Sequence, residues 1–316
     1  MLSGAQIEEF DSRGYLVVPD VIPQPVMDAV RGEYAALLDR LYAGWHAEGK
    51  VATPPERLDF WGKLLTAYAA RCDYFQPMDI SLPGDRIAAD TPFHFGPAVF
   101  DMITASPLLD IVEQLIGPEI TSNPIQHVRI KPPARTLASD EIRAHITATD
   151  WHQDRGVTHA EADETDMVTV WIAVTDATVE NGCLQVQPGG KSAGMLPHCP
   201  RTQTGIAEGF IDEAAGLPLP VPSRGVVLFH PLTPHASLPN MTDGFRWSFD
   251  IRFNRTGQPT GRAHFPEFVA RSRARPETVL QDWREWKKSW EDARTRLAAR
   301  PHIDIHRWTS DAPYCA

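Results

Sequence analysis

A short motif in the middle of the chain has the residue types and spacing of a metal site. His152 and Asp154 are two positions apart, so on a strand both side chains would point to the same face. His235 follows a distant strand-like run and would supply a third ligand. Two neutral imidazoles and one carboxylate leave three adjacent positions open on an octahedral iron. Such an iron could hold a bidentate co-substrate and dioxygen at the same time.

The spacing of this pair is weak evidence on its own, because the chain has 12 His and 41 acidic residues. Three other pairs share the spacing: His46/Glu48, His159/Glu161 and His302/Asp304. The first lies in a region expected to be helical, where residues i and i+2 do not share a face. The second lies in an acidic loop, and the third is too close to the C-terminus for another ligand strand to follow. Only His152 and Asp154 precede an ordered series of strand-like runs.

The runs that follow the motif are rich in β-branched and aromatic residues, and turn residues separate them. They span about 167–174, 183–186, 225–229 and 246–253. The last run alternates between polar and apolar residues. We expect two loops, 155–166 and about 195–220, to flank these strands and cover a pocket. Short strands separated by turns predict an antiparallel sandwich or jelly roll.

Both ends of the chain are expected to be helical. Residues 1–120 contain an amphipathic segment at about 25–43 and a short helix at 108–115, which Gly117 ends. Residues 276–299 predict one helix, whose stripe of tryptophans should pack on the barrel. No linker composition separates these parts, so we expect a single domain over residues 1–316, with its β core at about 121–256.

Composition narrows the class of protein. A chain of 316 residues can bury a large core, and its net charge of −11 argues against nucleic acid or an anionic membrane as a partner. No apolar run approaches the length of a membrane span, and the N-terminus lacks the pattern of a signal peptide. The four cysteines are scattered, so we expect reduced thiols in a cytoplasmic protein. A monomer or small homo-oligomer acting on a small molecule fits these features.

A series of short motifs, in order along the chain, resembles the phytanoyl-CoA dioxygenase family of Fe(II)- and 2-oxoglutarate-dependent oxygenases. The motifs are Gly14-Tyr15-Leu16-Val17-Val18, Lys131-Pro132-Pro133, His152-Gln153-Asp154, Trp171, Asn181-Gly182-Cys183-Leu184, Pro188-Gly189 with Lys191, Gly225, His235-Ala236-Ser237 and Gly244-Phe245-Arg246. The resemblance implies a double-stranded β-helix core, jelly-roll or cupin-like, flanked by N- and C-terminal helices. It also implies an iron site and a 2-oxoglutarate site.

The resemblance assigns roles to residues at matching positions. His152, Asp154 and His235 would bind the iron, and Arg246 would pair with the distal carboxylate of 2-oxoglutarate. A guanidinium fork suits this task, because it can hold a carboxylate through two hydrogen bonds. Three further residues are candidates for the co-substrate site: Ser237 for the same carboxylate, Trp171 for the pocket wall, and Gln126 for the 1-carboxylate or an iron-bound water.

Several alternatives stay open at this level. His230 rivals His235 as a ligand, and Arg252 rivals Arg246, since the two arginines share a strand face. Lys131 is left out of the site as a solvated strand end. Two more residues, His127 and Trp151, could line a substrate pocket, although aromatic residues beside strands more often pack in the core.

The predicted activity is oxidation, most simply hydroxylation, of a C–H bond in a small organic molecule, with dioxygen and 2-oxoglutarate as co-substrates and succinate and carbon dioxide as products. The carboxylate of Asp154 argues against halogenation, because related halogenases have a small residue there. Two other classes are considered: a cupin-type metal enzyme that does not use 2-oxoglutarate, and a non-catalytic small-molecule binder on the same fold.

Overall fold

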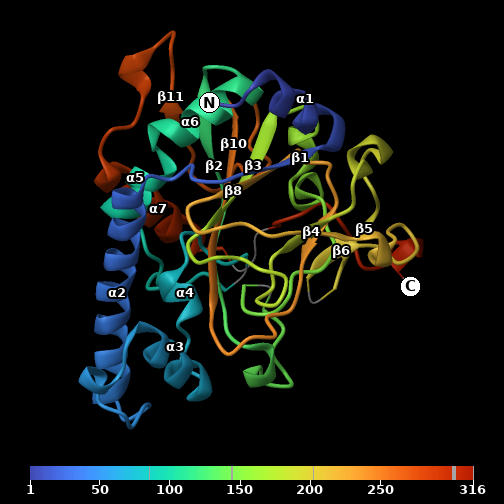
Figure 1. The fold of residues 1–316 in the computed structure, drawn as a ribbon. Coiled ribbons are helices and arrows are strands. Elements are labelled where there is room, and N and C mark those ends of the chain that lie inside the picture. The colour runs from blue at the N-terminus through green and yellow to red at the C-terminus, as the bar shows by residue number, and fades with distance from the viewer. Residues whose placement is uncertain (85, 144, 202, 301–303, 316) are drawn as a thin grey trace.

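The computed structural model describes residues 1–316 except 85, 144, 202, 301–303 and 316. Its framework is a six-stranded antiparallel sheet in the order β1-β8-β3-β10-β2-β11 (Figure 1). The strands are β1 (Tyr15–Val18), β2 (Ile120–Lys131), β3 (Met167–Ala173), β8 (Val226–Phe229), β10 (Arg246–Arg255) and β11 (Phe268–Arg271). Two smaller antiparallel sheets join β7 (Leu217–Leu219), β4 (Leu184–Val186) and β9 (His235–Ser237), and β5 (His198–Pro200) with β6 (Thr204–Ile206).

The two faces of the large sheet carry different kinds of side chain, because side chains alternate along each strand. On β10, Trp247, Phe249, Ile251 and Phe253 belong to the largest apolar cluster of the molecule. The intervening residues of β10, from Arg246 to Arg252, are polar and point to the other face. That face meets the β7-β4-β9 sheet, with which it shares a second apolar cluster that includes Trp171 of β3. The predicted fold class, a mainly β jelly-roll core with flanking helices, is confirmed.

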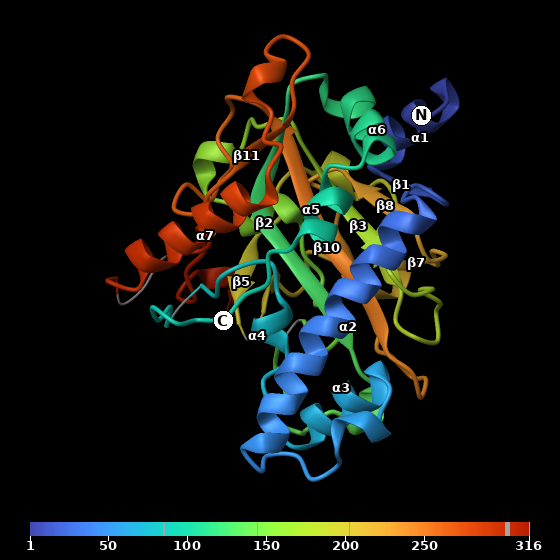
Figure 2. The ribbon, with the colours of Figure 1, turned by 90° about the vertical axis from the view of Figure 1, so that its left-hand side faces the viewer.

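Helices cover the outer face of the large sheet (Figure 2). They are α1 (Gly4–Arg13), α2 (Gln24–Ala47), α3 (Phe60–Ala69), α4 (Phe75–Met78), α5 (Pro97–Ile103), α6 (Ser106–Ile116) and α7 (Trp283–Leu297). Gly117 caps α6 with a positive φ of 91°, as the sequence predicted. On α7, Trp286 and Trp290 are buried, so the predicted packing of this aromatic stripe is confirmed.

The expected loops contain more structure than the sequence indicated. Within 195–220 the chain forms the β5–β6 hairpin and β7, each strand only three residues long. Strands this short cannot show a periodic pattern. The stretch 155–166 instead forms short 3-10 turns, at Asp154–Val157 and Ala160–Ala162. That these two stretches cover a substrate pocket stays a prediction.

The prediction of four reduced thiols is wrong for two of the cysteines. Cys199 on β5 and Cys315 near the C-terminus form a disulfide, with 5.4 Å between their Cα atoms. The tertiary fold brings together cysteines that are 116 residues apart, which no local pattern could show. Cys72 and Cys183 are free and buried.

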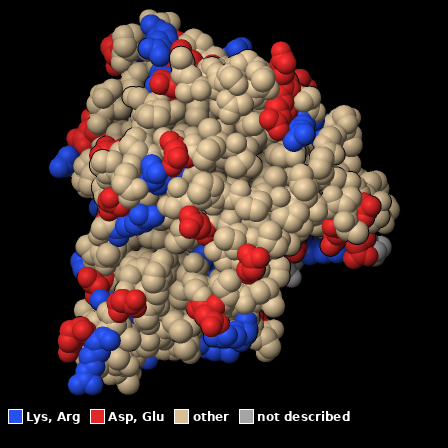
Figure 3. All heavy atoms as spheres, viewed as in Figure 1, with Lys and Arg blue, Asp and Glu red and all other residues tan. Residues whose placement is uncertain are grey.

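Two surface properties bear on the expected partners. Within the described part of the chain, no helix is both long and apolar enough to cross a membrane. On the face drawn in Figure 3, basic and acidic side chains are interspersed. Nucleic-acid binding depends instead on basic side chains gathered along the phosphate backbone.

Replacing Trp290 with alanine should destabilise the protein by about 3–5 kcal/mol, because the indole is fully buried and packs against Phe95 and Phe265. Lys288→Ala on the same helix is the matched control, since Lys288 is exposed and pairs with Asp292 at the helix surface. Its cost should stay within about 0.5 kcal/mol. Urea unfolding of both variants checks this, and equal midpoints would show that α7 is not part of the core.

Candidate metal centre and co-substrate pocket

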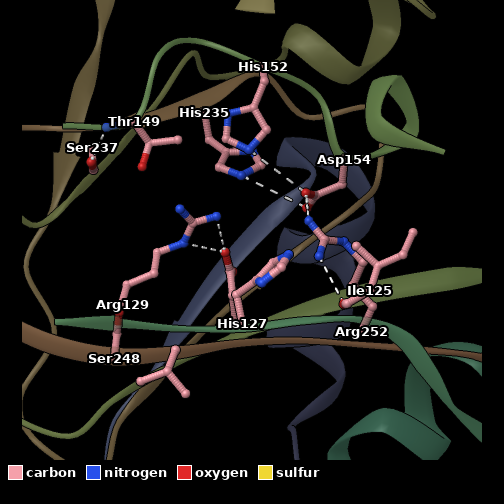
Figure 4. Close-up of polar contacts among 12 residues, drawn as sticks. Ile125, His127, Arg129, Thr149, His152, Asp154, His235, Ser237, Ser248 and Arg252 are labelled. Atoms are coloured by element: carbon pink, nitrogen blue, oxygen red, sulfur yellow. Dashed lines mark hydrogen bonds and ion pairs between the residues drawn. The ribbon is translucent and has the colours of Figure 1, made fainter. Parts of the chain in front are cut away.

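The structure brings His152, Asp154 and His235 together in one buried group (Figure 4). His152 Nε2 lies 3.9 Å from Asp154 Oδ1, and His235 Nε2 lies 3.9 Å from Asp154 Oδ2. One ligand atom from each residue lies within 4.8 Å of the others. Three nitrogen and oxygen donors this close, and withdrawn from solvent, form a pocket for a single cation.

A backbone bridge sets the positions of the two histidines. The N–H of His152 donates to the carbonyl of His235 at 2.9 Å, and the N–H of His235 donates back at 2.9 Å. Gln153 is extended, with φ −113° and ψ 138°, and Asp154 then begins a 3-10 turn. His152 and Asp154 are therefore not on a regular strand as predicted, but one extended residue between them preserves their shared face.

Both imidazoles have the tautomer that a metal ligand needs. Nδ1 of His152 donates to the carbonyl of Asp150 at 2.8 Å, and Nδ1 of His235 donates to that of Thr233 at 3.0 Å. A carbonyl can only accept, so the proton lies on Nδ1 and the lone pair of Nε2 stays free. Burial, reinforced by repulsion from His235, lowers the pKa of His152 to about 3, which keeps its ring neutral.

Asp154 has one oxygen paired and one open. Oδ1 accepts a hydrogen bond from the guanidinium of Arg252, whose other nitrogen donates to the carbonyl of Ile125 at 3.0 Å. Oδ2 is buried without a hydrogen-bond partner. Burial, the largest influence, raises the pKa of this carboxyl, but Arg252 and the two histidines beside it together outweigh burial and hold the pKa of Asp154 below its usual value. An orphaned carboxylate oxygen facing two free imidazole nitrogens fits a divalent iron.

Beside this group lies a small cavity lined by Trp171 and Arg246. The Arg246 guanidinium is fully buried, donates to Ser248 Oγ at 2.6 Å, and lies 5.3 Å from the centre of the Trp171 ring. Its Nε has no partner, and among the described residues no carboxylate pairs with it. Burial, followed by repulsion from Arg129, lowers the pKa of Arg246. The protein thus buries a cation here without supplying its anion.

Lys131 is a second buried cation at the same place, and its prediction as a solvated strand end is wrong. It is 1% exposed and faces Arg246 in the β10–β2 register. Its ammonium donates to Ser237 Oγ at 2.5 Å and to Thr149 Oγ1 at 3.2 Å, both neutral groups. Burial and repulsion from Arg246 lower its pKa well below the usual value. The Lys-Pro-Pro motif marked this strand end, but only the tertiary fold shows that it is covered.

Ser237 lies next to this cationic pair, but Gln126 lies on the wrong face of β2. The Gln126 amide donates to the carbonyl of Ile80 at 2.8 Å, on the helical side of the sheet. Its neighbours His127 and Arg129 point to the site instead, and Arg129 pairs with Asp250 at 2.8 Å. An error of one residue in a strand exchanges the two faces, which is what occurred here.

The other residues that the sequence left open lie outside the metal group. His230 is not part of the metal group; its Nδ1 accepts from the N–H of Leu232 at 3.2 Å. Arg252 forms an ion pair with Asp154 and does not line the small cavity beside Arg246. Trp151 packs with Ile206 and Ala236. His302, of the weakest histidine and acid pair, lies outside the described residues.

A model of the family described as "Phytanoyl-CoA dioxygenase (PhyH)" matches residues 10–248. The chain belongs to the phytanoyl-CoA dioxygenase family. A similar curated relative is phytanoyl-CoA dioxygenase domain-containing protein 1 of Bos taurus, 29% identical over 84% of this chain and 98% of that protein. A probable phytanoyl-CoA dioxygenase of Caenorhabditis elegans is 24% identical over 80% of this chain and 75% of the relative.

Solved structures show the same fold at low identity. A non-heme monooxygenase, ThoJ in its apo form, superposes with a TM-score of 0.60 at 18% identity, covering 94% of this chain and 98% of that one. The epimerase SnoN, in complex with Fe3+, alpha ketoglutarate and nogalamycin RO, gives 0.52 at 17% identity, covering 82% and 87%. The family and the fold that the sequence resembled are therefore confirmed.

His235→Ala should abolish tight Fe(II) binding, and His230→Ala should leave it unchanged. The loss should exceed the roughly 10- to 100-fold that removal of an outer partner of a metal ligand costs. Equilibrium dialysis of the purified variants with Fe(II) under nitrogen measures both affinities. If His230→Ala loses the iron and His235→Ala keeps it, the ligand set is wrong.

Proposed function

We propose that this protein is an Fe(II)- and 2-oxoglutarate-dependent dioxygenase that hydroxylates a C–H bond of a small organic acid. The observation that carries the proposal is the pair of buried cations, Arg246 and Lys131, beside the three metal-binding residues. Membership of a dioxygenase family supports the same activity.

The donor set fits both the metal and the co-substrate. His152, Asp154 and His235 would hold Fe(II) and leave adjacent positions for a chelating ligand. 2-Oxoglutarate carries two negative charges, and its distal carboxylate would supply the anion that Arg246 lacks. Lys131, which contacts Ser237, would add positive charge near the distal carboxylate. Trp171 forms part of the wall of the cavity beside Arg246. When bound, iron, 2-oxoglutarate and dioxygen supply the oxidising chemistry.

The residues of this chain prepare the site for that chemistry. Arg252 keeps Asp154 charged and oriented, and the Nδ1 hydrogen bonds hold both imidazoles with Nε2 inward. The cavity next to Arg246 measures about 10 Å³, so its lining side chains must move apart to admit a co-substrate. Filling this space would exclude water from the metal-binding residues.

The two alternative classes explain the site less well. A cupin-type enzyme that does not use 2-oxoglutarate would have no need for a buried guanidinium without an anionic partner. A non-catalytic binder would have no need for two imidazoles and a carboxylate oxygen left free toward one another. Both features carry a cost in stability, which a bound metal and a dianion would offset.

A larger cavity, of about 220 Å³, is the proposed place for the substrate. Two hydrogen bonds connect its wall to neighbours of the metal group. Ile125, in its wall, accepts a hydrogen bond from Arg252, the partner of Asp154. Arg262, also in its wall, donates at 2.7 Å to the carbonyl of Val157, at the end of the turn that Asp154 begins. His127 lines the same space and pairs with Asp79 at 2.9 Å.

The walls of this cavity suit an organic acid with an apolar or aromatic body. Phe75 stacks on His145 at 4.1 Å between ring centres, and Phe265 adds further apolar surface. Arg262 is buried, and among the described residues no carboxylate pairs with it. Burial, followed by repulsion from Arg252, lowers the pKa of Arg262, so a substrate carboxylate would relieve an unfavourable charge.

Replacing Arg246 with methionine should weaken 2-oxoglutarate binding by roughly 2–5 kcal/mol, because a buried carboxylate loses its charged partner. The measurement is an anaerobic titration of the Fe(II) protein with 2-oxoglutarate, followed by the weak visible charge-transfer band. Arg255→Met is the matched control, since Arg255 is exposed at the other end of the same strand. Unchanged affinity in Arg246→Met, or turnover without 2-oxoglutarate, would favour the cupin-type alternative.

Arg262→Gln should raise KM for the substrate by roughly 10- to 100-fold, as expected from about 1.5–3 kcal/mol for a charged hydrogen bond. The affinity for 2-oxoglutarate should not change. A screen of aromatic and aliphatic carboxylic acids, each beside its neutral amide, would be scored by succinate release. Equal release with acid and amide, or an unchanged response in Arg262→Gln, would exclude the acid-binding role of this cavity.

A further inference from the structure

Gln153, the residue between His152 and Asp154, is anchored to the segment 194–198 and also donates to the carbonyl of Leu232 at 2.7 Å. Gln153 is fully buried, and its amide nitrogen donates to the carbonyl of Gly194 at 2.8 Å. Its amide oxygen accepts from the N–H of Leu196 at 2.7 Å. A displacement of the segment 194–198 would therefore pull on the backbone that joins His152 to Asp154.

His198 makes the third connection, directly to that backbone. Its Nδ1 donates to the carbonyl of Leu196 at 2.8 Å, which leaves Nε2 to accept the N–H of Gln153 at 3.0 Å. The ring also lies against Gly156: a Cβ added to that glycine would come within 2.5 Å of it. The imidazole thus fills the space behind the turn, and His198 is not one of the three metal-binding residues.

The C-terminal strap, defined as residues 304–315, holds His198 from outside. Trp308 stacks on the His198 ring at 5.2 Å between centres, and its Nε1 donates to the carbonyl of Gly156 at 2.6 Å. Arg307 donates to the carbonyl of Thr158 at 2.9 Å and pairs with Asp163 at 2.7 Å. The strap therefore closes over the same turn that Asp154 begins.

A disulfide attaches the far end of the strap to β5, because Cys315 is bonded to Cys199, the residue after His198. Most residues between Trp308 and Cys315 are exposed. A chain end with so little buried surface stays in place only when it is tied down. The bond also shortens the covalent connection between Trp308 and His198, which raises the effective concentration of their contact.

We propose that the C-terminal strap is a positioning element for the metal centre, and that the Cys199–Cys315 disulfide makes metal affinity depend on the thiol–disulfide state. A dithiol reductant would transfer two electrons and two protons, giving thiols at Cys199 and Cys315 and the oxidised form of the reductant. Trp308 would then leave His198, and the turn that carries Asp154 would lose its outer support. The inference rests on the metal centre alone and not on the use of 2-oxoglutarate.

The test compares Cys315→Ser with Cys72→Ser, a matched control whose cysteine is buried, free and remote from the strap. Co(II) affinity would be measured under nitrogen from the visible absorption of the bound ion, without co-substrate or substrate. We expect about tenfold weaker binding in Cys315→Ser, the lower end of what losing an outer partner of a metal ligand costs. Wild-type protein reduced with a dithiol, then freed of it by gel filtration, should match Cys315→Ser, and reoxidation should restore its affinity.

A pair of variants at Trp308 separates positioning from general stability. Trp308→Ala should weaken Co(II) binding as Cys315→Ser does, and Trp308→Phe, which keeps the stack on His198, should recover part of it. Unfolding temperatures measured beside these affinities identify a variant that is merely less stable. The proposal is overturned if Cys315→Ser and reduced wild type bind Co(II) as tightly as oxidised wild type. It is also overturned if peptide mapping of the air-oxidised protein finds both cysteines as thiols.

Discussion

The ion pair between Arg252 and Asp154 is the contact around which the site is arranged. A carboxylate withdrawn from water is stable only with a charged partner, and loss of one member of such a pair costs about 3–5 kcal/mol. Arg252 meets this need with one nitrogen and uses another to hold the carbonyl of Ile125. The same side chain therefore fixes the charge of a ligand, its orientation, and the edge of the neighbouring cavity. The second oxygen of Asp154 is left for a cation.

One face of the large sheet packs in the apolar core, and the other carries the residues of the site. Its outer face binds the helices through a continuous apolar cluster, and its inner face carries the arginines and acids of the site. The β10–β2 pairing shifts register between Asp250 and Arg252, where the ladder is irregular. Asp250 pairs with Arg129 on one side of this shift, and Arg252 reaches Asp154 on the other. Alternation along a single strand thus supplies both a charge-balanced pair and a support for the metal ligand.

The sequence was sufficient where function depends on local spacing. The His152 and Asp154 pair, the later His235 and the alternating run from Arg246 to Phe253 could be recognised from the order of residues alone. The sequence did not show which face of β2 each side chain occupies, because a shift of one residue exchanges the two faces. Gln126 was therefore chosen although its neighbours His127 and Arg129 line the site. The prediction that Lys131 is exposed to solvent was wrong, because the residues that bind its ammonium, Thr149 and Ser237, come from distant segments. The disulfide could not be predicted for the same reason, since its two cysteines are 116 residues apart and no local pattern connects them.

Gly156 carries a consequence for the history of this chain. The His198 ring occupies the place where any other residue would have its Cβ, so that position can change only if the imidazole moves. The imidazole in turn is covered by Trp308. Gly156, His198 and Trp308 therefore depend on one another sterically, although the three are distributed over much of the sequence. In relatives that end before the strap we expect the glycine to be free to vary, and in relatives that retain it we expect all three residues to be present.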